Sequence, residues 1–114
     1  MKIIRVAEYA PAPGGRFISD GLFSGEWFRD EVLRPALAEA IKEDDTLCVE
    51  LDGAAGYGSS FLEEAFGGLI RNQQFPRAEI ERHLSVVAKT RLYKPYQGLV
   101  ERYIREARAS RVAA

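Results

Sequence analysis

The sequence of 114 residues has little of what several classes of protein require. Its single cysteine, Cys48, has no second cysteine to pair with, which excludes an internal disulfide and is typical of a reduced, cytoplasmic chain. No apolar run approaches the roughly 20 residues that cross a bilayer. The apolar stretch at the N-terminus is too short for the core of a signal peptide. We therefore expect a cytoplasmic domain without a membrane segment.

An excess of charge of one sign is also missing. Sixteen basic and seventeen acidic side chains leave a net charge of −1, which argues against a general nucleic-acid binder because such proteins are strongly basic. The one histidine, His83, and the one cysteine have no spacing typical of metal ligands. We therefore expect no metal site and no cofactor.

Apolar patterning predicts a single α/β domain over residues 1–114, with a frayed tail from about residue 110. Strands are predicted at residues 1–6, 46–51 and 84–88, with a short return strand at residues 16–18. Helices are predicted from Ser24 to residue 41, over residues 61–72, in a short segment after Pro76, and from Pro95 onward. The strand at residues 46–51 is apolar enough to be central in the sheet. Pro35 predicts either a kink or a break between two short helices.

Residues 49–71 are the most informative segment for function. A buried strand is followed by Asp52, a glycine-rich loop at residues 53–58, and a helix start that carries Ser59 and Ser60. Such a helix start gathers unpaired N–H groups and the positive end of the helix dipole. The candidate partner-binding or anion-binding residues in and near this loop are Asp52, Gly56, Tyr57, Gly58 and Arg16.

Several of these candidates have two interpretations. Tyr57 either projects as a contact residue or closes over the helix end. Arg16 either meets an anion or ends a turn. Ser59 and Ser60 either serve as a plain N-cap, worth about 1 kcal/mol, or accept a regulatory phosphate. Trp27 and Phe28 are adjacent, so we expect one to face the core and the other to anchor an interface.

Known catalytic and nucleotide-binding loops do not fit this segment. A phosphate-binding loop of the triphosphatase type needs lysine where Ser59 stands, and the dinucleotide fingerprint needs glycine where Phe61 stands. A nucleophile elbow needs glycine at Leu62, and His83 would have to reach Ser60 to complete a serine hydrolase. We therefore assign no catalytic residues and do not expect an enzyme.

Residues 13–37, together with LDGAAGYGSSFLEEAFGGLI, resemble a prokaryotic STAS-like family of unassigned function, and the resemblance runs from Met1 to about Ala88. The resemblance implies a mixed sheet of about four strands with helices mainly on one face. It also implies partner switching: in the distantly similar anti-sigma factor antagonists, a kinase of the histidine-kinase-like ATPase fold phosphorylates a serine in an Asp-Ser-Ser-Gly motif. Gly58-Ser59-Ser60-Phe61 aligns with that motif and places Ser60 at the phosphoacceptor position, with both flanking residues replaced.

The expected function is a regulatory protein-interaction module that binds a protein partner through residues 53–60 and the following helix. The resemblance implies a histidine-kinase-like ATP-binding protein as that partner, and phosphorylation of Ser60, or else Ser59, as the control. The alternative is a sensor that binds a nucleotide or another anion at the same helix N-terminus. The sequence does not predict the oligomeric state.

Overall fold

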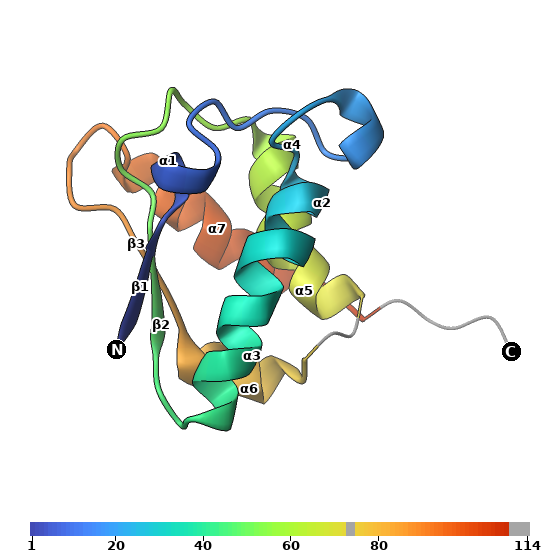
Figure 1. Ribbon diagram of the computed structural model, residues 1–114, viewed down its shortest axis with the longest axis vertical. Coiled ribbons are helices and arrows are strands. Elements are labelled where there is room, and N and C mark those ends of the chain that lie inside the picture. Colours follow the sequence, from blue (N-terminus) through green and yellow to red (C-terminus); the bar gives the residue numbers. More distant parts are fainter. Residues whose placement is uncertain (73–74, 110–114) are drawn as a thin grey trace, which may run out of the picture.

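The computed structural model describes residues 1–72 and 75–109, so the predicted frayed tail at residues 110–114 lies outside the described residues. Strands and helices alternate along the chain (Figure 1). In chain order the elements are β1 (Lys2–Arg5), α1 (Val6–Tyr9), the 3₁₀ turn η1 (Ile18–Asp20), α2 (Gly25–Phe28), the π-helical turn η2 (Arg29–Leu33), α3 (Arg34–Lys42), β2 (Leu47–Glu50), α4 (Ser59–Leu62), the π-helical turn η3 (Glu63–Gly67), α5 (Gly68–Arg71), α6 (Arg77–His83), β3 (Leu84–Val87) and α7 (Lys94–Glu106).

The sheet has three strands in the order β1-β2-β3, and both pairs are parallel. Parallel neighbours need crossover connections, which the helices of residues 25–42 and 59–83 supply. β2 is buried along its whole length, which confirms the predicted central strand. The prediction of a mixed sheet of about four strands is wrong for the described residues, which form three parallel strands.

The predicted return strand at residues 16–18 is a turn instead. The Asp20 carboxylate accepts the N–H groups of Arg16 and Phe17, and the Asp20 N–H donates to the Phe17 carbonyl. These local bonds curl the backbone into η1 and compete with strand pairing.

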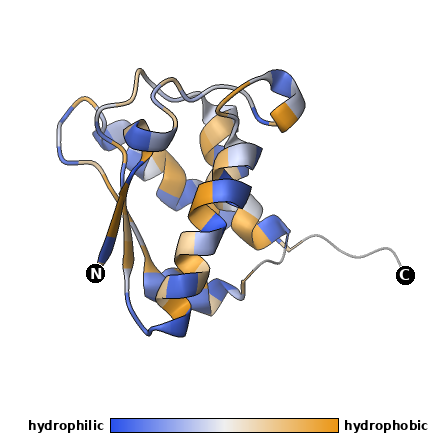
Figure 2. Cartoon of the chain, viewed as in Figure 1, coloured by the Kyte–Doolittle hydropathy of each residue, from blue (hydrophilic) through white to orange (hydrophobic). Residues whose placement is uncertain are grey.

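The core lies between the sheet and the helices, most of which are on one side of the strands (Figure 1). Register places Ile4, Val49 and Val86 side by side in the sheet, and all three belong to the hydrophobic core. Figure 2 shows the strands as hydrophobic over most of their length. The prediction of helices mainly on one face of the sheet is therefore confirmed. None of the described helices is long and apolar enough to cross a bilayer.

The opposite face of the sheet is partly open to solvent. Ile3 remains 48% exposed on it. The Glu50 carboxylate of β2 links β1 to the loop after β3 there, because it contacts Arg5 Nε at 2.9 Å and Lys89 Nζ at 2.7 Å. These ion pairs cover part of a face that parallel sheets usually bury under helices.

Residues 25–42 form one continuous helical stretch that widens into a π turn at η2. Ser24 is its N-cap, as predicted, and its hydroxyl accepts the Trp27 N–H at 3.0 Å. Pro35 lies in the first turn of α3, directly after η2, so the residue that cannot donate an N–H within the helix follows the wider π turn. The helix does not break there, so the second outcome predicted for Pro35 holds only in that α3 begins beside it.

Residues 59–71 form a second helical stretch, and it also widens into a π turn, at η3. Its contact with the first stretch is close: a Cβ on Gly25 would lie 2.5 Å from the Phe61 carbonyl oxygen, and one on Gly68 would lie 2.5 Å from Arg29 Nη1. The pair Gly67–Gly68 therefore marks close packing against a neighbour, as its position inside a helix indicates.

Candidate functional site

Asp52 fastens the loop after β2 to the loop after β3. Its carboxylate accepts the N–H of Lys89 at 2.8 Å, and the N–H and hydroxyl of Thr90 at 2.9 and 2.7 Å. Desolvation by burial acts to raise the pKa of Asp52, but these hydrogen bonds outweigh it and hold the pKa below its usual value. The carboxylate is therefore occupied within the chain and positions residues 53–60.

The glycine-rich loop takes backbone conformations that favour glycine. Gly53 and Gly56 have φ values of +99° and +136°, a region that side chains other than glycine rarely adopt. Between them, the Ala55 N–H donates to the Pro11 carbonyl at 2.8 Å. The loop is thus fixed at both ends and in the middle.

Tyr57 closes over the helix end, so the alternative of a projecting contact residue is wrong. Its side chain is buried, and its hydroxyl donates to the Leu51 carbonyl at 2.7 Å. Its ring packs edge-on against Tyr96, with the centroids 5.1 Å apart, and also contacts Phe61 and Tyr93. Burial raises the pKa of the Tyr57 hydroxyl well above its usual value.

Ser59 and Ser60 are exposed and begin α4. The N-cap is Gly58, whose backbone is extended and whose carbonyl accepts the Leu62 N–H, so the interpretation of either serine as the N-cap is wrong. Within the described ranges, neither hydroxyl has a hydrogen-bond partner. The two serines are therefore accessible groups at the start of a helix that is otherwise held firmly.

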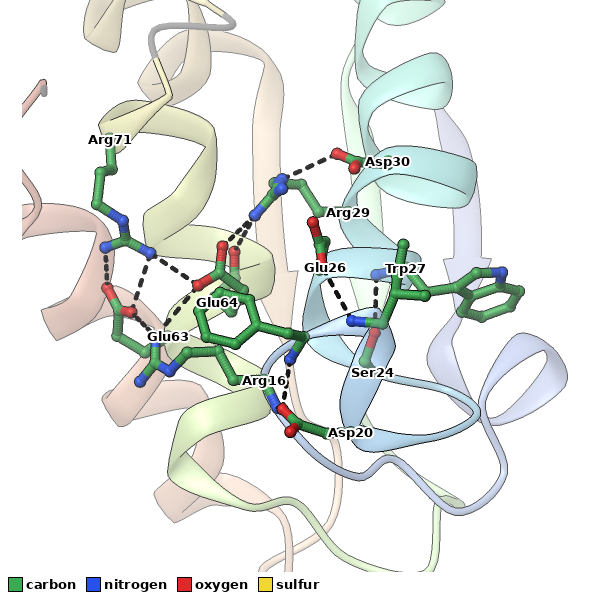
Figure 3. Close-up of polar contacts among 12 residues, drawn as sticks. Arg16, Asp20, Ser24, Glu26, Trp27, Arg29, Asp30, Glu63, Glu64 and Arg71 are labelled. Atoms are coloured by element: carbon green, nitrogen blue, oxygen red, sulfur yellow. Dashed lines mark hydrogen bonds and ion pairs between the residues drawn. The ribbon is translucent and has the colours of Figure 1, made fainter.

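Arg16 contacts carboxylates of the chain itself (Figure 3). Its guanidinium lies 2.5 Å from Glu63 Oε1 and 3.2 Å from Glu64 Oε1. Arg71 contacts Glu63 at 2.6 Å and Glu64 at 3.3 Å, and Arg29 pairs with Glu64 and Asp30. The sequence interpretations of Arg16, as an anion contact or as the end of a turn, both missed this role.

The ion-pair network has a buried centre, and its other members are partly exposed. Arg29 and Glu64 are 4% and 6% exposed, and Arg29 also donates to the Glu64 carbonyl at 3.1 Å. Burial acts to raise the pKa of Glu63, but Arg71 and Arg16 outweigh it and lower that pKa. Three guanidinium groups contact three carboxylates, so the network has no net charge. The Arg29–Glu64 pair within it connects the two helical stretches. The ion pairs of Arg16 and Arg29 with Glu63 and Glu64 join residues 35 to 48 positions apart, so no local signal reveals them.

A second surface feature, which the sequence did not predict, lies on the loop before α2. Phe17, Ile18 and Leu22 are 48%, 55% and 83% exposed, and a hollow of about 410 Å³ is lined by Ile18, Gly21, Leu22, Phe23 and Trp27. We call residues 17–23 and Trp27 the apolar loop. Phe28 is fully buried, while Trp27 is half-buried and packs against the edge of the core, so the two do not face the core equally, as expected.

The apolar loop is held in place by hydrogen bonds of the residues that flank it. The Gly25 N–H donates to the Gly15 carbonyl at 3.1 Å, and the Gly14 N–H to the Phe23 carbonyl at 3.1 Å. The Glu26 carboxylate accepts the Ile18 N–H. Phe23 has a φ of +58°, a strained value for a bulky residue. Compact loops of this kind frequently carry function.

The residues of a serine hydrolase are not brought together. His83 is buried, with its Nδ1 2.7 Å from the Asp45 carbonyl oxygen, before the start of β2. Ser60 follows the end of the same strand, beside the loop that Asp52 fastens. Among the residues that the structure describes, no group of three or more side chains is arranged to hold a metal ion.

The fold and this site define a small α/β domain with an exposed serine pair after its central strand. The model of the STAS-like domain of unknown function (DUF4325) matches residues 24–90, and the chain belongs to this family. The resemblance seen in the sequence is thereby confirmed. The match includes residues 53–60 and both π turns, while β1, Arg16 and α7 lie outside it. No curated protein and no solved structure is significantly similar to the chain.

Proposed function

We propose that this domain is a regulatory interaction module, without catalytic activity of its own, whose protein partner binds residues 53–60 and the helix that follows. A phosphate on Ser60 controls the contact. The observation that supports this most is the exposure of Ser59 and Ser60, whose hydroxyls have no partner among the described residues at the start of α4. Asp52 and Tyr57 hold the loop before the two serines, and the ion-pair network holds the helix after them.

The electrostatics of the helix favour a phosphate on Ser60. A phosphoserine carries about −1.5 to −2 charges at neutral pH, and the positive end of a helix dipole tolerates them. Glu63 and Glu64 lie one turn further along and would repel a phosphate if they were free. Both are neutralised by arginine side chains, so the repulsion is reduced.

The apolar loop provides a second part of the proposed interface. It lies close to α4, because its neighbour Gly25 abuts Phe61 of α4, and Arg16, just before it, reaches Glu63, just after α4. Its side chains are carried on a backbone that is already ordered, so forming a complex costs little conformational entropy of the loop. A phosphate at the edge of such an apolar contact changes the affinity of the domain for its partner, because the phosphate is charged and strongly hydrated. The partner class, a histidine-kinase-like ATP-binding protein, follows from the family resemblance alone.

The test combines the purified domain with histidine-kinase-like ATP-binding proteins encoded in the same genome, and with ATP. We expect intact mass to show one added phosphate on the wild type and on Ser59→Ala, but none on Ser60→Ala. We also expect size-exclusion chromatography to show a complex that Ser60→Asp weakens. If neither a phosphate nor a complex is observed, the proposal is wrong.

The alternative, a sensor of nucleotides or other anions, would use the free N–H groups of the first turn of α4. The structure gives it less support, because four surface hollows of about 410–480 Å³ in the described part of the chain are lined by other segments. A thermal shift assay with a nucleotide panel separates the two functions. A ligand that binds only the folded state raises the melting temperature, whereas a purely protein-binding module gives no shift.

A further inference from the structure

The two edges of the sheet differ in how they are protected. β1 carries Lys2 and Arg5, which are paired with Glu39 and Glu50, and charged side chains on an edge strand discourage further pairing. β3, with the sequence LSVV, has no charge and no proline. The β3 edge thus has none of the side chains by which proteins usually block strand addition.

Several backbone groups of β3 point away from the sheet. The Leu51 N–H donates to the Val87 carbonyl, so Ser85 and Val87 face β2, and Leu84, Val86 and Ala88 face outward because alternate residues of a strand point to opposite sides. The Leu84 N–H bonds to Ile80 within α6, and the Ala88 N–H bonds to the Gln97 side chain at 2.8 Å. The Leu84 carbonyl and both polar groups of Val86 have no partner in the described parts of the chain.

A groove runs beside this open edge. Its volume is about 430 Å³, and it lies between β3, α6 and α7. Its apolar lining comes from Ile80, Leu84, Val86, Val100 and Ile104. The groove is therefore placed to receive side chains from a strand that pairs with Val86.

The rim of the groove is acidic. Two exposed carboxylates, Glu81 and Glu101, stand against one exposed guanidinium, Arg105. We propose that β3 accepts an extended peptide segment of another protein as a fourth strand, with apolar side chains at alternate positions in the groove and basic side chains at the rim. Main-chain bonds to Leu84 and Val86 supply affinity, and the groove and rim supply specificity.

The charge of the rim also argues against a second copy of this chain as the occupant. Two copies joined at β3 would bring four carboxylates together with two guanidinium groups. Like charges at an interface are unfavourable. A basic peptide instead meets a rim of opposite charge.

The test uses nuclear magnetic resonance of the full chain labelled with ¹⁵N. In the free protein, we expect the Val86 amide to exchange with deuterium faster than the Val87 amide. The probe is a blocked hexapeptide of alternating lysine and valine, with a glutamate–valine peptide as its matched control. We expect the basic peptide to shift the amide signals of residues 84–88 and to slow the exchange of Val86, and the acidic peptide to bind about tenfold more weakly.

Two variants test the role of the rim. Glu101→Lys should weaken binding of the basic peptide about tenfold, whereas Glu31→Lys, the same change at an exposed site of η2, should leave it unchanged. The proposal is overturned if Val86 is already protected in the free monomer, if millimolar basic peptide shifts no signal of β3, or if both peptides bind equally. A concentration-dependent dimer that protects Val86 without peptide would also overturn it, in favour of a second copy.

Discussion

At the scale of single residues, Asp52 is the candidate site residue whose role the structure defines most clearly. Its carboxylate takes three hydrogen bonds from Lys89 and Thr90, and asparagine at this position would keep only one acceptor oxygen. We expect Asp52→Asn to lower the free energy of unfolding by about 1–2 kcal/mol at neutral pH.

The effect of Asp52→Asn depends on pH with a definite sign. Because the pKa of Asp52 is lowered in the folded state, its stabilisation is complete above the unfolded pKa of about 3.9 and is lost as the pH falls through the folded value. Urea unfolding at several pH values should show a constant difference between variant and wild type from pH 6 to pH 8 that shrinks below about pH 4. Glu31→Gln, at an exposed carboxylate, is the control. A difference that persists at low pH would contradict this account.

The residues of the site also show where sequence reasoning ends. Ser60 and Ser59 were predicted as accessible hydroxyls from a local pattern of strand, glycine loop and helix, and they are exposed. Arg16 was misread because its partners Glu63 and Glu64 lie 47 and 48 residues away. The sequence does not decide between the two interpretations of Tyr57, because the burial of its ring depends on Tyr96, which lies on α7, outside the loop.

At the scale of elements, the contact between α2 and α4 depends on one glycine. A Cβ on Gly25 would lie 2.5 Å from the backbone carbonyl oxygen of Phe61 and 3.2 Å from the Ala65 nitrogen, so Gly25→Ala would push the two helices apart. We expect a loss of about 1–3 kcal/mol in the free energy of unfolding.

Gly98→Ala is the matched control for this prediction. Gly98 is exposed within α7, and a Cβ there would meet nothing within 4 Å. The gain in helix propensity should stabilise the protein by up to about 1 kcal/mol. Thermal unfolding should therefore move in opposite directions for the two variants. If both variants are stabilised, the helices are not in the close contact described.

The order of the helices and of the three strands was predictable from local signals. Ser24 marks a helix start, and the apolar run before Asp52 marks the central strand. The π turns η2 and η3 were not predictable, because a wider turn shifts the phase of the following residues without leaving a composition of its own. The sheet was predicted with a fourth strand because residues 16–18 have strand-like composition, and Asp20 fixes them as a turn.

At the scale of the whole molecule, the most exposed side chains of the apolar loop contribute surface rather than core, unlike Phe23 and Trp27, which pack against the core. Ile18 and Leu22 are 55% and 83% exposed, so the double variant Ile18→Ser, Leu22→Ser should change the free energy of unfolding by less than about 0.5 kcal/mol. Its retention on a hydrophobic interaction column should fall. The measurement pairs chemical unfolding with chromatography of the same samples. A marked loss of stability would show that the two side chains pack against the fold.

Lys2 and Arg5 on β1 determine how far an assembly of this protein can extend. A sheet that is open at both edges can add neighbours without end and form fibres. In the described sheet, β1 carries charged side chains and β3 does not, so a strand that pairs with β3, even that of another copy, leaves no second uncharged edge for further growth. The domain is thereby suited to discrete complexes of fixed stoichiometry.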